Sequence, residues 1–102
     1  MANSPAFSSI ISTRAQKEIA SSWTWYEERQ RGLGDRFVKE IIDRIRKIEA
    51  TPERYPLRYK IYRETPVLIF PYLIIYRINK RKHSVRIVAV FHTLLNPKKK
   101  FR

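Results

Sequence analysis

One histidine and two arginines are the side chains in this sequence that could take part in catalysis. His92 follows the apolar run at residues 85–91, at the point where a predicted strand ends. Histidine titrates near neutral pH, so His92 could act as a general acid or base, or could simply cap the strand end. Arg63 and Arg77 belong to neighbouring predicted strands and could stabilise an anionic transition state.

Basic and aromatic side chains are interleaved along the predicted strands. Contact with phosphate, base stacking and contact with an acidic protein all need such a surface. The candidate residues for binding a partner are Arg58, Lys60, Tyr62, Arg63, Arg77 and Arg86. The alternative is that these cations are only solvated. We assign Tyr72 and Tyr76 to the core, because they share a strand face with two isoleucines. We interpret the basic turn at 80–83 and the basic tail at 98–100 as solvated charge that steers a partner.

The net charge indicates an anionic partner. Lys and Arg number 22 against 9 Asp and Glu, which gives a formal charge of +13 in only 102 residues. Such an excess is typical of a protein that binds nucleic acid or an acidic protein. The hydrophobic fraction of 43% is that of a globular chain. We therefore expect residues 1–102 to form one domain with one core.

Several kinds of site are not expected. Without cysteine there is no disulfide, and two histidines alone argue against a zinc site, so we expect no metal and no cofactor. Gly32 and Gly34 do not complete a phosphate-binding glycine loop. No apolar segment reaches the ~18 residues of a membrane span, and residues 1–11 do not resemble a secretory signal. A cytoplasmic location is expected.

Residues 66–92 contain the elements that would position the candidate site residues. An apolar and aromatic run to residue 78, a basic turn at 79–84 and a second run at 85–91 predict a long β-hairpin. Pro71 cannot donate a ladder hydrogen bond, so we expect a bulge or bend there. Strict alternation would put four residues of the second strand on one face. They are Val85, Ile87, Ala89 and Phe91.

The sequence before the hairpin predicts a strand and two helices. Residues 7–11 are β-prone, and Thr13 with Gln16 fits a capping box that opens a helix to about Arg31. Gly32 suits a left-handed helix stop, and a second helix then runs to about Ala50. Apolar residues at helical spacing form its stripe. They are Leu33, Phe37, Ile41, Ile45 and Ile48.

A further strand is predicted from the alternation of basic and apolar residues at 58–63, followed by a turn at 64–66. The element order is then β-α-α-β-β-β. This order predicts a two-layer α+β domain in which the N-terminal strand and the helical hairpin pack on a mainly antiparallel four-stranded sheet. The last three strands should be mutually antiparallel. The direction of the first strand stays open.

Five segments, in this order and spacing, resemble the RelE/ParE superfamily of type II toxin–antitoxin toxins. The resemblance covers nearly the whole chain and implies a curved sheet under a helical hairpin. It also implies neutralisation by an acidic antitoxin in a hetero-oligomer. The segments are STRAQKEI at 12–19, GLGDRF at 32–37, TPERYP at 51–56, FPYLIIYRI at 70–78 and IVAVFHTLLNP at 87–97.

The resemblance divides by target. RelE-like members cut messenger RNA on the ribosome, whereas ParE-like members poison DNA gyrase without catalytic residues of their own. RelE-like nucleases carry an arginine where this chain has Leu73, and another just after the last strand, where it has residues 93–95, Thr-Leu-Leu. The C-terminal tyrosine of many nucleases has no counterpart here. These departures favour a ParE-like toxin that binds gyrase.

Two alternatives remain open from the sequence. One is a RelE-like, ribosome-dependent endoribonuclease, whose partners would be the ribosome and messenger RNA. His92 matches a histidine of some nuclease members, and Arg63, Arg77 and Lys60 could rebuild a basic site. The other alternative is a non-toxic basic module that binds nucleic acid.

Overall fold

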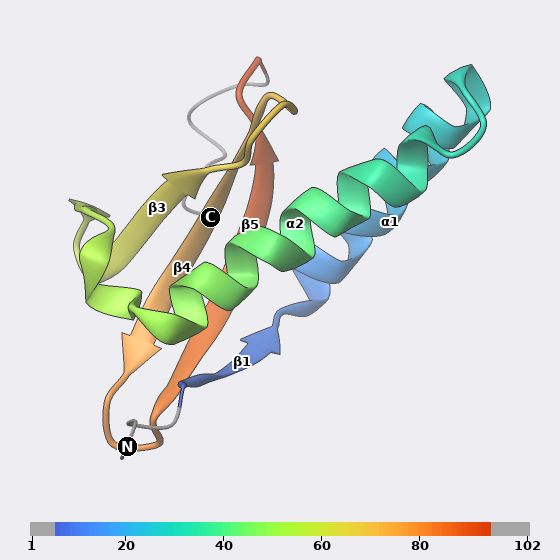
Figure 1. The fold of residues 1–102 in the computed structure, drawn as a ribbon. Coiled ribbons are helices and arrows are strands. Elements are labelled where there is room, and N and C mark those ends of the chain that lie inside the picture. Colours follow the sequence, from blue (N-terminus) through green and yellow to red (C-terminus); the bar gives the residue numbers. More distant parts are fainter. Residues whose placement is uncertain (1–5, 95–102) are drawn as a thin grey trace.

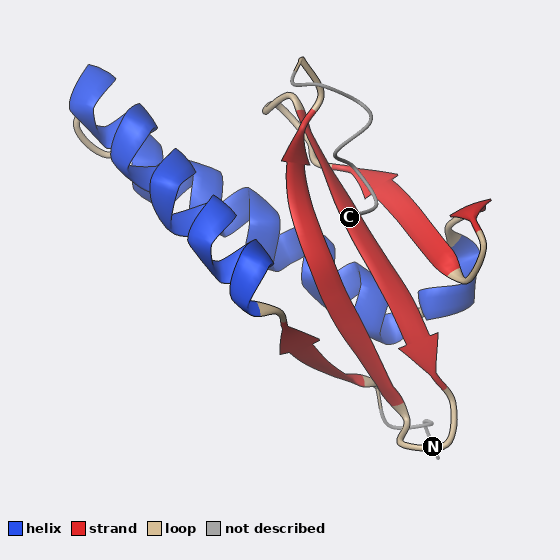
Figure 2. Ribbon diagram, turned by 180° about the vertical axis from the view of Figure 1, so that it is seen from behind, coloured by secondary structure: helices blue, strands red, loops and turns tan. Residues whose placement is uncertain are grey.

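A helical hairpin lies across one face of a five-stranded sheet in the computed structural model, which describes residues 6–94 (Figures 1 and 2). The strand order is β1-β5-β4-β3-β2, with β1 parallel to β5 and the other pairs antiparallel. The elements are β1 Ser8–Ile11, α1 Thr13–Arg29, α2 Leu33–Ala50, the 3-10 helix η1 Pro52–Arg54, β2 Leu57–Tyr59, β3 Tyr62–Pro66, β4 Tyr72–Asn79 and β5 Ser84–His92. The α+β class and the predicted element order are therefore confirmed. The basic tail at 98–100 lies outside the described residues.

The sheet has five strands rather than the predicted four, because the segment at 58–63 folds into two. The chain turns at Lys60, whose φ is +52°, and β2 pairs back on β3. No glycine or proline marks this turn in the sequence, so the alternation of basic and apolar residues at 58–63 continues across it without a break. Residues 64–66, expected to form a turn, belong to β3. The bend expected at Pro71 is present, between β3 and β4.

The start of α1 differs by one residue from the sequence prediction. Ser12, not Thr13, is the N-cap, and its Oγ accepts a hydrogen bond from the backbone N of Ala15 at 3.0 Å. Gln16 donates to the carbonyl of Ile11 at 2.8 Å rather than closing a capping box. The helix ends at Arg29, two residues earlier than expected.

The connection between the helices is stabilised by the Glu27 carboxylate, and the two helices approach each other closely at Gly34. Gly32 has the predicted left-handed conformation, with φ of +88°. Glu27 of α1 accepts from the backbone N of Gly32 at 2.9 Å and of Gly34 at 3.0 Å, so it satisfies amides at the start of α2. Gly34 lies against Trp23, where a Cβ would be 2.7 Å from the Trp23 carbonyl oxygen. A side chain at Gly34 would therefore push the two helices apart.

The core lies between the helical hairpin and the sheet. The predicted stripe of α2 is confirmed, with Phe37, Ile41, Ile45 and Ile48 buried. Tyr72 and Tyr76 of β4 are also buried in this core, as predicted. Tyr76 donates its hydroxyl hydrogen to the carbonyl of Pro52, which ties η1 to the sheet.

Strand β5 changes face at Val88, so strict alternation was wrong for its second half. Ile75 pairs with Ala89 but the next residue, Tyr76, pairs with Ile87, which leaves one extra residue on β5. This bulge puts Val85, Ile87 and Val90 in the core under the helices. Ala89 and Phe91 pack instead with Ile75 on the opposite face.

Candidate partner-binding surfaces

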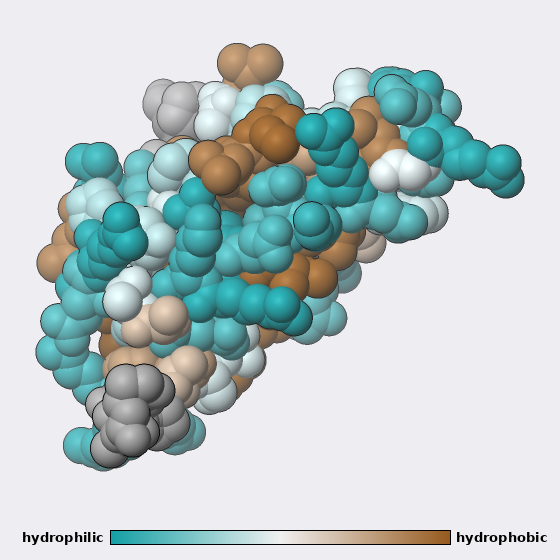
Figure 3. Space-filling view, in the orientation of Figure 1, coloured by the Kyte–Doolittle hydropathy of each residue, from teal (hydrophilic) through white to brown (hydrophobic). Residues whose placement is uncertain are grey.

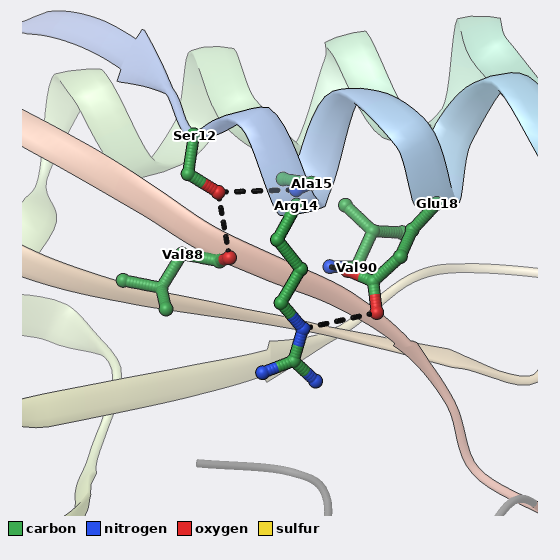
Figure 4. A network of polar contacts seen from close by, with 6 residues as sticks. All are labelled: Ser12, Arg14, Ala15, Glu18, Val88 and Val90. Carbon is green, nitrogen blue, oxygen red and sulfur yellow. Dashed lines mark hydrogen bonds and ion pairs between the residues drawn. The ribbon is translucent and has the colours of Figure 1, made fainter. Parts of the chain in front are cut away.

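Helix α1 closes the edge of β5 that extends beyond β1. The last β1 pairing is Ile11 with Ile87. Ser12 donates from Oγ to the carbonyl of Val88 at 2.7 Å, and the Val90 backbone N donates to Glu18 at 2.9 Å (Figure 4). Arg14 holds the other carboxylate oxygen of Glu18 at 3.3 Å. The Val88 carbonyl and the Val90 amide are therefore not available to an added strand.

A groove of about 670 Å³ lies between α1 and the C-terminal half of β5, and we call it the α1–β5 groove. Its floor is aromatic: Tyr72 donates to the hydroxyl of Ser22 at 2.8 Å, and the ring of His92 meets Tyr72 edge-on at 5.0 Å between centroids. Trp25 forms part of the wall and is 51% exposed. Arg29 lies over the Trp25 ring, 3.5 Å from its centroid. The groove thus offers a half-exposed indole beside a largely apolar floor.

The groove has an exposed positive charge, whereas its negative charge is already paired. Lys17 lines it and is exposed, whereas the carboxylate of Glu18 is already held by Arg14 and the Val90 amide. Burial, with Tyr72 nearby, raises the pKa of Tyr26 to about 12, so this phenol is neutral at physiological pH. An apolar segment that carries a carboxylate fits these surroundings best.

A second groove of about 560 Å³ runs between α1 and α2 and has no charged side chain in its lining. It includes Trp23 and Ile42, which are 37% and 43% exposed. Figure 3 shows hydrophobic surface on both sides of α2 on an otherwise largely hydrophilic face. This groove offers apolar contact area but no charge to select a partner.

Four of the predicted partner-binding residues share the face of the sheet that is turned away from the helices, which we call the outer sheet face. Arg77 of β4 lies directly opposite Arg86 of β5, and both are exposed. Arg58 pairs with Glu64 at 3.7 Å, and Tyr62 packs on the cluster of Ile75, Ala89 and Phe91. The other two predicted residues are elsewhere. Arg63 donates to the carbonyls of Glu53 and Tyr55, at 3.2 and 2.7 Å, and Lys60 occupies the β2–β3 turn.

The three catalytic candidates do not meet. His92 pairs with Tyr72 and lines the α1–β5 groove, whereas Arg63 pairs with Tyr76, four residues along β4, and is held at η1. At ~3.4 Å per strand residue, their partners Tyr72 and Tyr76 are roughly 14 Å apart along β4, and His92 and Arg63 also lie on opposite sides of that strand. Arg77 lies on the opposite face from both. General acid–base chemistry needs groups within hydrogen-bond reach of one reacting atom. The arrangement gives no such convergence.

The described part of the chain offers neither a metal site nor a membrane span. No group of three or more His, Cys, Asp or Glu side chains among residues 6–94 could hold a metal ion. None of the helices in this range is long and apolar enough to cross a bilayer.

The family of this chain follows from a match over most of its length. Residues 10–95 match the model of the ParE toxin of the type II toxin–antitoxin system parDE. The chain belongs to the ParE toxin family. It is therefore a toxin of a type II toxin–antitoxin system within the RelE/ParE superfamily, as the sequence resemblance implied.

Solved structures share the fold of this toxin at low sequence identity. The chromosomal ParDE toxin–antitoxin system of P. aeruginosa matches with a TM-score of 0.75 and 12% identity, over 87% of this chain and 98% of the other. The RelBE2 toxin–antitoxin complex of Mycobacterium tuberculosis matches with a TM-score of 0.64 and 18% identity, over 88% and 94%. No curated protein matches the toxin. At these identities the structures establish the fold and not the target.

Sequence reasoning missed the α1–β5 groove of the toxin. Of its lining residues, only His92 was a candidate. The available signal was Trp25, an aromatic residue at the margin of the apolar stripe of α1, where a core residue is not needed. That His92 and Trp25 line the same groove depends on the bulge at Val88, because without the bulge His92 would point to the outer sheet face.

Proposed function

We propose that this toxin acts by binding DNA gyrase, without catalysis of its own, and that an acidic antitoxin neutralises it. The observation that carries the proposal is the separation of His92, Arg63 and Arg77 over two faces of the sheet. Phosphodiester cleavage needs proton transfer and charge stabilisation at one phosphate. A toxin without such a centre must inhibit its target by binding it.

The centre of the outer sheet face supports this proposal. RelE-like nucleases have an arginine at the position of Leu73, and here Leu73 pairs with Phe91 beside the buried Ile75 and Ala89. These side chains cannot stabilise a developing charge. The RelE-like alternative therefore finds no support in the middle of the sheet.

The α1–β5 groove is the proposed seat of the antitoxin. The solved complexes of similar fold contain an antitoxin, and the toxin has a formal charge of +13, which favours an acidic partner. Lys17 is the exposed cation of the groove, and Trp25 offers the kind of aromatic anchor that dominates protein interfaces. We expect an apolar antitoxin segment flanked by carboxylates to lie along α1.

Two parallel assays with the purified toxin test the proposed target. In the first, the toxin is added to gyrase and relaxed plasmid, and supercoiling is followed on gels. In the second, it is added to a translation extract and messenger ends are mapped on ribosomes. We expect inhibited supercoiling and intact message. Cleaved message with normal supercoiling would overturn the proposal in favour of the endoribonuclease.

A further inference from the structure

Two arginines face each other across the β4–β5 ladder, and neither has a counter-ion among the described residues 6–94. Arg77 and Arg86 are register partners on the outer sheet face, and both are exposed. Like charges directly opposite each other destabilise a sheet. Within residues 6–94, no carboxylate forms an ion pair with either guanidinium. An anion bound between the two arginines would remove their repulsion.

The adjacent hairpin turn extends this positive charge. Arg81 and Lys82 are exposed there, and the turn is ordered by a hydrogen bond from the Lys82 backbone N to Asn79 Oδ1 at 3.1 Å. The ring of His83 stacks on Phe7 at 3.8 Å, which fixes the turn against the start of β1. The cations are thus carried by an anchored turn, so its backbone would lose little conformational freedom on binding.

We propose that Arg77, Arg86, Arg81 and Lys82 contact the phosphate backbone of duplex DNA. Contact with phosphate needs only positioned cations, whereas a protein interface also needs an apolar anchor in a pocket. The apolar grooves described above flank α1, on the helix side of the sheet, and neither includes any of these four residues. Single-stranded nucleic acid would need exposed aromatic rings beside these cations for stacking, whereas Tyr62 of the neighbouring strand β3 is half-buried on the cluster of Ile75, Ala89 and Phe91.

This inference rests on the proposed function for its biological meaning, because gyrase acts on duplex DNA. We call the part of the β4–β5 hairpin that carries these four cations the hairpin end. A toxin that binds gyrase through other surfaces and DNA through the hairpin end would bind the gyrase–DNA complex more tightly than gyrase alone. The hairpin end would then be a second contact of the toxin with its target, separate from the antitoxin groove.

The test is fluorescence anisotropy of a labelled 20-base-pair DNA duplex of arbitrary sequence, titrated with the full-length toxin at several KCl concentrations. The variant Arg77→Gln with Arg86→Gln removes two cations from the hairpin. The control Arg36→Gln with Lys39→Gln removes two exposed cations from α2. Circular dichroism verifies that all three proteins are folded.

We expect the hairpin variant to bind DNA more weakly. The slope of the logarithm of its association constant against the logarithm of the KCl concentration should be shallower by about two, because two phosphate contacts are lost. The α2 control should keep the wild-type slope. Equal losses in both variants would mean that only net charge matters, and would overturn the proposal. So would the absence of DNA binding by the wild type.

A third titration separates DNA from an acidic protein. Poly-L-glutamate serves as the acidic polypeptide. A hairpin variant that binds DNA like the wild type but loses affinity for poly-L-glutamate would assign the surface to a protein and overturn the proposal. Because these titrations contain no gyrase, they fail or succeed independently of the supercoiling assay.

Discussion

At the scale of single residues, polar atoms decide where the strands and the helices meet. Ser12 caps α1 and also donates to the bulged Val88, and Glu18 receives the Val90 amide from the same strand. Tyr76 links β4 to η1 through the Pro52 carbonyl. Apart from the local cap, each of these contacts joins segments far apart in the sequence, so local patterns do not reveal it.

Tyr76 also predicts a pH dependence of stability. Burial raises the pKa of Tyr76 to about 12. The nearby Tyr55 also raises this pKa, whereas the positive charge of Arg63 lowers it. An unfolded tyrosine ionises near pH 10, so the unfolded chain loses this proton first as the pH rises. The contribution of Tyr76 to stability is therefore complete below pH 10 and is lost between pH 10 and about 12, by up to ~1.4 kcal/mol per pH unit.

The variant Tyr76→Phe isolates this effect. At neutral pH we expect it to lower the free energy of unfolding by roughly 1–3 kcal/mol, because the Pro52 carbonyl loses its buried partner. Between pH 10 and 12 its stability should fall less steeply than that of the wild type. Urea titrations at pH 7, 10 and 11.5 measure both effects. Parallel pH curves for the two proteins would contradict the raised pKa.

At the scale of elements, the sequence predicted the order and the type of nearly every element. The apolar stripe of α2 and the runs around the basic turn at 79–84 are local patterns, and both correspond to observed elements. The split between β2 and β3 was not predictable, because Lys60 takes a left-handed conformation without a glycine to mark it. The face switch at Val88 was hidden for another reason. The carbonyl of the bulged Val88 accepts from Ser12, which is 76 residues away in the sequence, and the alternation within β5 does not mark the bulge.

These two misses also explain why the candidate site was only partly predictable. The basic residues could be identified one by one, since charge is visible in the sequence. Their grouping depends on which face each strand presents. Arg77 and Arg86 meet on the outer sheet face, but Arg63 is on the helix side and His92 joins the α1–β5 groove.

The close approach of α1 and α2 at Gly34 predicts whether Gly34→Ala raises or lowers the stability of the fold. Alanine is a better helix former than glycine by about 1 kcal/mol, so propensity alone would make Gly34→Ala stabilising. The new Cβ would lie 2.7 Å from the Trp23 carbonyl oxygen, and we expect destabilisation by roughly 1–3 kcal/mol instead. Chemical denaturation measures the difference.

Gly32→Ala is the matched control for this crossing. A Cβ at Gly32 meets nothing within 4 Å, so only its left-handed backbone conformation is penalised, by about 1 kcal/mol. Glu27 would keep both of its amide partners in this variant. A Gly34→Ala protein as stable as the wild type, or more stable, would show that the helices can separate without cost.

At the scale of the whole molecule, the toxin presents two different surfaces on opposite sides of its sheet. The helix side carries the apolar grooves, and the outer sheet face carries the facing pair Arg77 and Arg86. An antitoxin along α1 and DNA at the outer sheet face would use separate contacts. Neutralisation by the antitoxin would then require steric coverage or a competing contact as well as charge.

The groove assignment predicts a selective loss of antitoxin affinity. We expect Trp25→Ala with Lys17→Glu to weaken binding of the cognate antitoxin by at least tenfold, because an anchor and an attractive charge are both lost. The matched variant Trp23→Ala with Lys39→Glu changes the other groove and α2, and should bind nearly as the wild type does. Calorimetric titration of each variant measures the affinities. A larger loss in the Trp23 variant would move the antitoxin to the groove between α1 and α2.

The most direct test of the central claim is the binding of fluorescently labelled toxin to purified gyrase in the absence of ribosomes. A partner-binding toxin without a catalytic centre should give a saturable complex that forms at the same concentrations as supercoiling is inhibited. We expect that result, and we expect a His92→Ala variant to retain it, since His92 does not belong to a shared reactive site. The absence of any gyrase complex at concentrations where messenger RNA is cleaved on ribosomes would contradict the account.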